Sequence, residues 1–185
     1  KLREEGDAAM TAKNYPEVVA KYSEYLKLTN YEDESRIFNC AFAAYNAKKY
    51  DDAIKFYDMA IQKGYKADDA YVGKAMSLRS QDKAADFTAT VEAGLKANAQ
   101  NANLEKLLYA YCMKKGQAAQ KAGKTEEAEE NFKKVIPLNH KTYKTNALYS
   151  LGVLCYNDGA NILKKAAPLA NSDADKYAAE KEKAT

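Results

Sequence analysis

Residues 49–65 read KYDDAIKFYDMAIQKGY, and the same pattern of small and apolar residues returns at 14–30 and at 124–140. The returning block is about 34 residues long, and a second helix-like stretch precedes each copy. A fixed period of this length in helix–turn–helix units is typical of a solenoid, in which each unit buries its apolar face only against its neighbours. The sequence therefore predicts an all-α chain without a β-sheet.

The units align on one small residue in the first helix of each, which we call the marker residue of helix A. A pair of residues in the second helix, helix B, follows the marker by 19 residues in each of the first four units, although the linkers between units vary. A constant internal spacing is expected of a repeated packing unit. The markers are Gly6, Ala41, Ala75, Gly116 and Gly152, and the helix B pairs are Tyr25-Leu26, Ala60-Ile61, Gly94-Leu95 and Val135-Ile136.

In this register the sequence resembles the tetratricopeptide repeat (TPR). Its pattern has a small residue in helix A, an alanine early in helix B, an aromatic residue four positions later and Ala-Leu three positions after that. Two units match it with Ala53, Tyr57 and Ala60-Ile61, and with Ala128, Phe132 and Val135-Ile136. The first unit is a looser match and the third is degenerate. The repeat style is similar to that of TPR proteins from Bacteroidetes-type bacteria, many of which are exported, so the resemblance favours the cell envelope or periplasm over the cytoplasm.

The resemblance implies a right-handed α–α superhelix of about five helical pairs in a single domain over residues 1–185. The repeats are expected at about 1–30, 33–65, 68–99, 103–140 and 142–185. Residues 103–122 are expected to form one long helix, and the helix that carries Gly152 is expected to run on towards residue 170. A fresh helix should then begin with Ser172 as its cap. The last repeat is thus extended, and it is either truncated in its second helix or closed by a polar solvating cap.

The composition excludes several classes of function. Lys and Arg number 29 against 26 for Asp and Glu, the net charge is only +3, and there are three arginines, so a nucleic-acid partner is not expected. No run of 18 apolar residues exists, so no membrane span is expected. The chain begins without Met or an apolar signal segment, which fits a processed chain or an excised fragment.

Little in the chain points to chemistry. The only histidine, His140, follows a helix and is expected to be a capping or surface residue. Cys40, Cys112 and Cys155 lie among Ala, Tyr and Leu without metal-ligand spacing, so all three are expected to be small packing residues. No motif for nucleophilic, metal-dependent or nucleotide-dependent catalysis is present. The sequence therefore predicts no enzyme activity, no cofactor and no metal.

Binding is expected on helix A, because the resemblance implies that helix A side chains line a concave groove. Asp7 and Asp69 lie where TPR domains that grip a terminal carboxylate carry cations, so that mode of binding is disfavoured. The expected partner-binding residues form an apolar and aromatic strip with few charges. They are Phe38, Asn39, Phe42 and Tyr45 in the second repeat, Val72, Met76 and Arg79 in the third, Met113 and Gln117 in the fourth, and Tyr149, Val153 and Tyr156 in the fifth.

The resulting prediction is a non-catalytic scaffold that binds a protein or peptide along the helix A face. The alternative is a structural assembly subunit that self-associates through its ends or its groove. A signal that depends on added peptide would favour the scaffold, whereas a concentration-dependent dimer would favour the assembly subunit.

Overall fold

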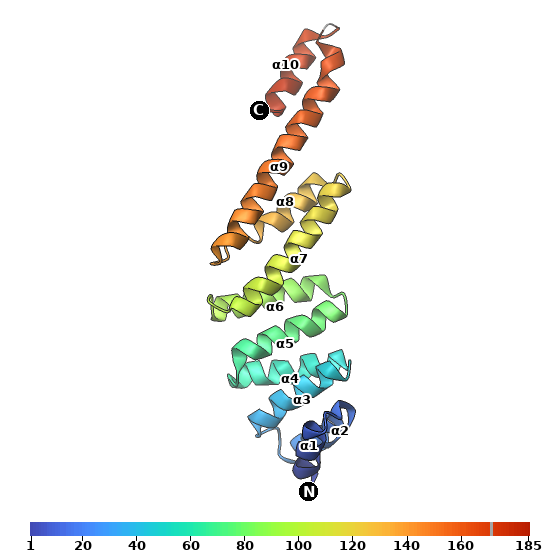
Figure 1. The fold of residues 1–185 in the computed structure, drawn as a ribbon, viewed down its shortest axis with the longest axis vertical. Helices are drawn as coiled ribbons and strands as arrows, with labels where there is room; N and C mark the ends of the chain where they lie inside the picture. Colours follow the sequence, from blue (N-terminus) through green and yellow to red (C-terminus); the bar gives the residue numbers. More distant parts are fainter. Residues whose placement is uncertain (171) are drawn as a thin grey trace. The chain divides into compact units, whose positions relative to one another are not determined.

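The computed structural model describes residues 1–170 and 172–185, and these residues contain ten α-helices, one short 3₁₀ helix and no strand (Figure 1). The chain divides into two compact units, Lys1–Leu104 and Glu105–Thr185, which are described separately below. This confirms the predicted all-α class and the predicted number of helices. The expected grouping of all repeats in one domain stays a prediction.

The first unit contains three helix A–helix B pairs, in which each helix packs against the next one along the chain. The A helices have the odd numbers and the B helices the even numbers. The helices are α1 (Leu2–Thr11), α2 (Tyr15–Leu28), α3 (Glu34–Asn46), α4 (Tyr50–Lys63), α5 (Ala67–Ser80) and α6 (Ala84–Ala97).

The second unit contains most of α7 (Ala102–Lys121), whose first turn lies in the first unit, and then α8 (Thr125–Lys133). The long helix α9 (Lys141–Ala166) follows, then a 3₁₀ turn (Ala167–Leu169) and α10 (Ala174–Lys183). Figure 1 shows α8 beside the N-terminal half of α9 and α10 beside its C-terminal half, and α9 packs against both. The predicted long helices at 103–122 and beyond Gly152 are confirmed.

The turn between helix A and helix B is the same in the first four repeats. Each helix A ends five residues after its marker. The residue seven positions after the marker has a positive φ, at 57° for Lys13, 59° for Lys48, 55° for Asp82 and 72° for Gly123. Side chains other than glycine rarely adopt this conformation, so its recurrence shows that the packing of the two helices determines the turn.

The predicted cap of the last helix is wrong. Ser172 was expected to cap this helix, but Asp173 does so by accepting a hydrogen bond from the Lys176 backbone N–H at 3.1 Å. The sequence pattern identified the turn but misplaced the cap by one residue.

We call the first four repeats the closed repeats, because in each of them helix B folds back on helix A. The core of each closed repeat is formed by the helix B residues 12 and 16 positions after the marker. At the first position lie Val18, Ala53, Phe87 and Ala128, and at the second Tyr22, Tyr57, Val91 and Phe132. All eight are at most 3% exposed. Full burial of one of the larger apolar side chains stabilises the folded state by about 1.5–3 kcal/mol. These two positions therefore hold helix B against helix A.

Candidate protein-binding surfaces

In the first and fourth repeats an aromatic ring from helix B packs directly on the marker glycine. A methyl group added to Gly116 would lie 2.5 Å from a carbon of the Phe132 ring, and one added to Gly6 would overlap the Tyr22 ring. Both rings come from the residue 16 positions after the marker. The absence of a side chain thus lets helix B approach helix A closely.

Gly152 is the marker of the fifth repeat, and its surroundings are different. Nothing lies within 4 Å of the position that a Cβ atom would take. In this repeat helix A does not end five residues after the marker but continues to Ala166. The residue 16 positions after Gly152 is Pro168, in the 3₁₀ turn. Within residues 1–170 and 172–185, the helix that folds back along α9 is α10, and its end lies beside Gly159 and not beside Gly152.

The sequence contains the reason why helix A of the fifth repeat does not end at the usual turn. Gly159 lies at the turn position, seven residues after the marker, and glycine would adopt the turn conformation at no steric cost. The helix B that would follow has Lys164 and Pro168 at the two positions that must be buried. Burying an unpaired lysine is unfavourable, and proline breaks a helix interior. The chain therefore continues as a helix through Gly159.

The predicted partner-binding residues of the first unit lie on α3 and α5 and differ in exposure. Phe42 is 43% exposed, and its ring makes an edge contact with Tyr15 at 6.0 Å between centroids. Arg79 is also exposed. Partly buried are Phe38, Asn39, Tyr45, Val72 and Met76.

Phe38 and Tyr45 are held by intramolecular contacts. The Phe38 ring packs edge-on against Tyr57 at 5.8 Å and Tyr65 at 6.3 Å, and the Lys66 ammonium lies 5.2 Å from its centroid. Tyr45 makes a tilted contact with Tyr50 at 5.9 Å. Their rings therefore serve the packing of the repeat, and Phe42 presents the larger free area.

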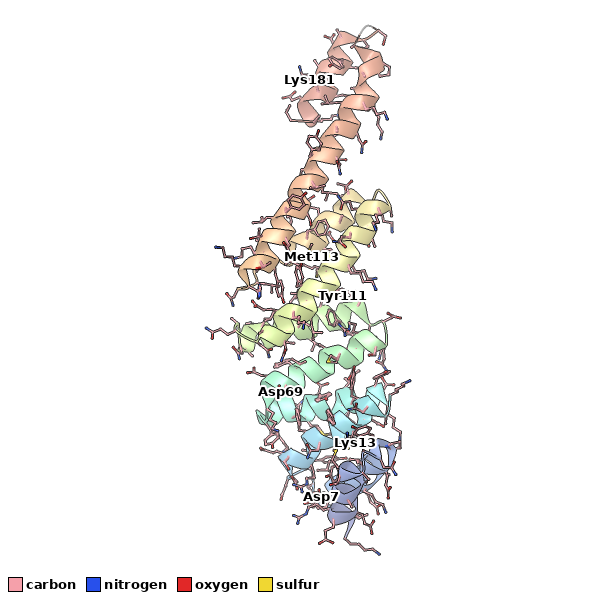
Figure 2. All side chains as sticks on the ribbon, in the orientation of Figure 1. Asp7, Lys13, Asp69, Tyr111, Met113 and Lys181 are labelled. Atoms are coloured by element: carbon pink, nitrogen blue, oxygen red, sulfur yellow. The ribbon has the colours of Figure 1, made fainter. Side chains whose placement is uncertain are left out.

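In the second unit the predicted residues lie on α7 and α9. Met113 on α7, labelled in Figure 2, is only 8% exposed, whereas Gln117 is exposed. Tyr149 and Tyr156 on α9 are 74% and 76% exposed, and Val153 between them is partly buried. Leu148, which is not among the residues predicted from the sequence, lies on the same helix and is 51% exposed. The poor helix B positions after Gly152 were the signal that could have identified it.

A comparison with solved structures identifies the family of this chain. A crystal structure at 1.50 Å resolution of a TPR repeats protein from Bacteroides fragilis NCTC 9343 is 49% identical in sequence. The match covers 99% of this chain and 82% of that chain, with a TM-score of 0.94. The chain belongs to the tetratricopeptide repeat family. No family model and no curated protein matches the sequence.

The TPR assignment confirms the fold class predicted from the sequence, an all-α solenoid of helical pairs. TPR folds generally mediate protein–protein interactions. Among the residues that the structure describes, no helix is both long and apolar enough to span a bilayer.

Asp7, which stands where some TPR proteins carry a cation, has a structural role here (Figure 2). It accepts hydrogen bonds from Tyr22 Oη at 2.6 Å and from the Arg36 guanidinium, whose Nη2 lies 2.9 Å from Asp7 Oδ2. Partial burial opposes ionisation, but the hydrogen bonds from Arg36 and Tyr22 outweigh it and lower the pKa of Asp7. Burial and the hydrogen bond to Asp7 raise the pKa of Tyr22 to about 12. The cluster therefore joins α1, α2 and α3.

The three cysteines do not share one environment. Cys40 and Cys112 are buried, as predicted, and burial raises the pKa of Cys40 to about 12. Cys155 on α9 is exposed, so the prediction that it is a packing residue is wrong. It lies three positions after Gly152, where the closed repeats bury Ala9, Ala44, Leu78 and Ala119.

His140 is the exposed N-cap residue of α9, and its side chain makes no capping hydrogen bond. Its ring stacks on Tyr143 at 3.8 Å between centroids, and Tyr143 stacks on Tyr109 at 4.0 Å. Asn146 donates a hydrogen bond to Tyr109 Oη at 2.8 Å. These contacts attach the start of α9 to α7 within the second unit, which agrees with the predicted surface position of His140.

One further hollow lies in the first unit, between α4, α5 and α6, with a volume of about 500 Å³. Ile54, Ile61, Tyr71 and Leu78 contribute to its apolar wall. Four of its charged side chains form two ion pairs, Lys74 with Asp58 at 2.7 Å and Lys83 with Asp51 at 3.4 Å. Within residues 1–170 and 172–185, no group of three His, Cys, Asp or Glu side chains could hold a metal ion.

Proposed function

We propose that this TPR chain is a non-catalytic scaffold that binds a protein or peptide through the exposed apolar side chains of its A helices. The observation that carries the proposal is the position of its exposed aromatic rings. Phe42, Tyr149 and Tyr156 are 43%, 74% and 76% exposed, and each lies on a helix A at a position selected for partner binding from the sequence.

The physical argument is the cost of leaving these rings in water. Contact between a large aromatic ring and water is unfavourable in free energy. A partner that covers the ring removes this contact, which favours binding. Aromatic side chains are also enriched among the residues that dominate binding energy at interfaces. Rings on rigid helices lose little conformational freedom when a partner binds, so more of the burial energy is available for affinity.

The experiment compares capture of proteins from a lysate of the source organism by the wild-type chain and by the double variant Phe42→Ala, Met76→Ala. We expect the variant to keep its circular dichroism spectrum and to lose the specifically retained protein. The control variant Gln62→Ala, Glu92→Ala removes two exposed side chains from helices α4 and α6 and should retain it. Equal recovery by the wild type and the Phe42→Ala, Met76→Ala variant would contradict the assignment of α3 and α5 to partner binding.

A further inference from the structure

The hollow of about 500 Å³ between α4, α5 and α6 is lined on α6 by small residues, and we call it the third-repeat hollow. Its residues on α6 include Ala89, Thr90 and Ala93. The helices α4 and α6 begin and end at equivalent positions, 34 residues apart. The residues of α4 at the three equivalent positions are all larger, namely Lys55, Phe56 and Met59.

In the second repeat the chain itself fills the equivalent place. Phe56 is 3% exposed and belongs to the core of the first unit, and Met59 packs against that core. The third repeat carries its large ring at a different position, where Phe87 is 0% exposed in the core that holds α6 against α5. The room that a phenylalanine ring takes up in the second repeat is therefore open beside Thr90 in the third.

The charges that line the third-repeat hollow do not balance. Among the described residues the lining contains three carboxylates and two ammonium groups. Both ammonium groups are ion-paired, Lys74 with Asp58 and Lys83 with Asp51. The third carboxylate, that of Asp86, is exposed and forms no ion pair within residues 1–170 and 172–185. The hollow thus offers one carboxylate to a cation from outside.

In the second repeat a lysine accompanies the equivalent aspartate. Asp52 corresponds to Asp86, and Lys55 follows Asp52 by three positions, which places the two side chains on the same face of α4. Ala89 stands in place of this lysine in the third repeat. The Lys55 ammonium also lies 5.6 Å from the centroid of the Phe56 ring. The second repeat therefore supplies an ammonium group and an aromatic ring together, and the third supplies neither at the equivalent positions.

The third-repeat hollow lies on the side of α5 opposite to the predicted partner-binding strip. Tyr71, Lys74 and Leu78 line the hollow at helical spacings of three and four residues. Met76 points to the opposite side of the helical wheel. The volume of the hollow lies within the range of about 300–1,000 Å³ that is typical of ligand sites. The hollow is thus a second surface of the first unit.

We propose that the third-repeat hollow binds a segment of a partner protein that presents an aromatic side chain beside a lysine or arginine. The ring fills the space beside Thr90, and the cation pairs with Asp86. Loss of contact between the ring and water favours binding. The ion pair selects against acidic segments, because like charges would then meet at the hollow. The proposal goes beyond the helix A surface of the proposed function and does not depend on it.

The probe is the capped dipeptide acetyl-Lys-Phe-amide, which carries the two groups that the proposal requires. Binding is followed by the shifts of backbone amide signals in ¹H–¹⁵N NMR spectra of the whole chain. We expect saturable shifts in α4, α5 and α6 with a Kd on the order of 1 mM. Acetyl-Lys-Ala-amide lacks the ring and should bind at least about tenfold more weakly. Acetyl-Glu-Phe-amide reverses the charge and should bind at least about threefold more weakly.

Two variants of the protein test the two groups of the hollow separately. Thr90→Phe fills the hollow from within, as Phe56 does in the second repeat, and should abolish the shifts with an unchanged circular dichroism spectrum. Asp86→Asn removes an exposed carboxylate and should weaken the binding of acetyl-Lys-Phe-amide about threefold. Glu92→Gln removes an exposed carboxylate of α6 outside the lining and should leave binding unchanged, as the matched control.

Any of four results would overturn the proposal. They are no saturable shift at about 10 mM acetyl-Lys-Phe-amide, equal binding of acetyl-Lys-Ala-amide, equal binding by Asp86→Asn and Glu92→Gln, and unchanged binding by folded Thr90→Phe. If Thr90→Phe does not fold, the other three results still decide. The double variant Phe42→Ala, Met76→Ala should bind the probe like the wild type, so this proposal and the proposed function can fail separately.

Discussion

Gly116 and Gly152 hold the same place in their repeats, yet one lies under an aromatic ring and the other has nothing within 4 Å. Both helices carry an apolar residue four positions before the marker glycine, Cys112 in one and Leu148 in the other. The difference arises 12 to 16 residues later, where the fourth repeat has Ala128 and Phe132 and the fifth has Lys164 and Pro168. The environment of a helix A residue is therefore determined by the helix B that follows it, because each repeat is stabilised only by neighbouring elements.

The largest expected effect contrasts the buried Ala60 with Gly152, where nothing lies within 4 Å of the position of a Cβ atom. Ala60 on α4 is 0% exposed, and Ala60→Asp places an unpaired charge between packed helices. We expect a loss of about 3–5 kcal/mol of stability in the first unit, measured by urea unfolding followed by circular dichroism. The control Gly152→Asp places the same charge where no atom is close and should change stability by less than about 0.5 kcal/mol. Similar unfolding curves for the two variants would contradict the contrast between the closed repeats and the fifth repeat.

Substitution by alanine should change the stability of the protein in opposite directions at the two marker glycines, and by less than Ala60→Asp does. Gly116→Ala forces a methyl group into the Phe132 ring and should destabilise the protein by about 1–3 kcal/mol. Gly152→Ala adds a methyl group in open space and improves helix propensity, so it should stabilise by about 0.5–1 kcal/mol. Thermal unfolding of the two variants beside the wild type measures both. A loss of stability in Gly152→Ala would show that Gly152 is packed within the chain.

The smallest effect concerns the hydrogen bond between Tyr22 and Asp7 in the first closed repeat. In the folded protein the pKa of Tyr22 is about 12, above the ordinary value of 10, so the Tyr22 hydroxyl keeps its proton up to a higher pH than in the unfolded chain. The stabilisation from this group is complete below pH 10 and is lost as the pH rises through about 12. Tyr22→Phe should be slightly less stable than the wild type at pH 7, by about 1 kcal/mol for the hydrogen bond. The gap in melting temperature between the two proteins should narrow above pH 10, and a constant gap up to pH 12 would refute the role of this hydroxyl group.

Much of the candidate site could be predicted from the sequence, and the misses have one cause. Phe42, Tyr149 and Tyr156 were selected by their register in helix A, and the structure leaves them exposed. Met113 has an equivalent register but is only 8% exposed, and Cys155 occupies a position that other repeats bury and yet is exposed. Register identifies which face of a helix a residue is on, but it does not tell whether another element covers that face.

The sequence by itself determined the repeat period, the pairing of helices and the place of each turn, because these depend on the local spacing of small, apolar and turn-forming residues. Only the tertiary structure decided which faces are covered. Gly159 has the turn register that the other repeats use, but the chain continues as a helix there because the segment after it cannot be buried. Burial depends on residues distant along the chain, so the exposed side of α9 emerged from the packing and not from its local sequence pattern.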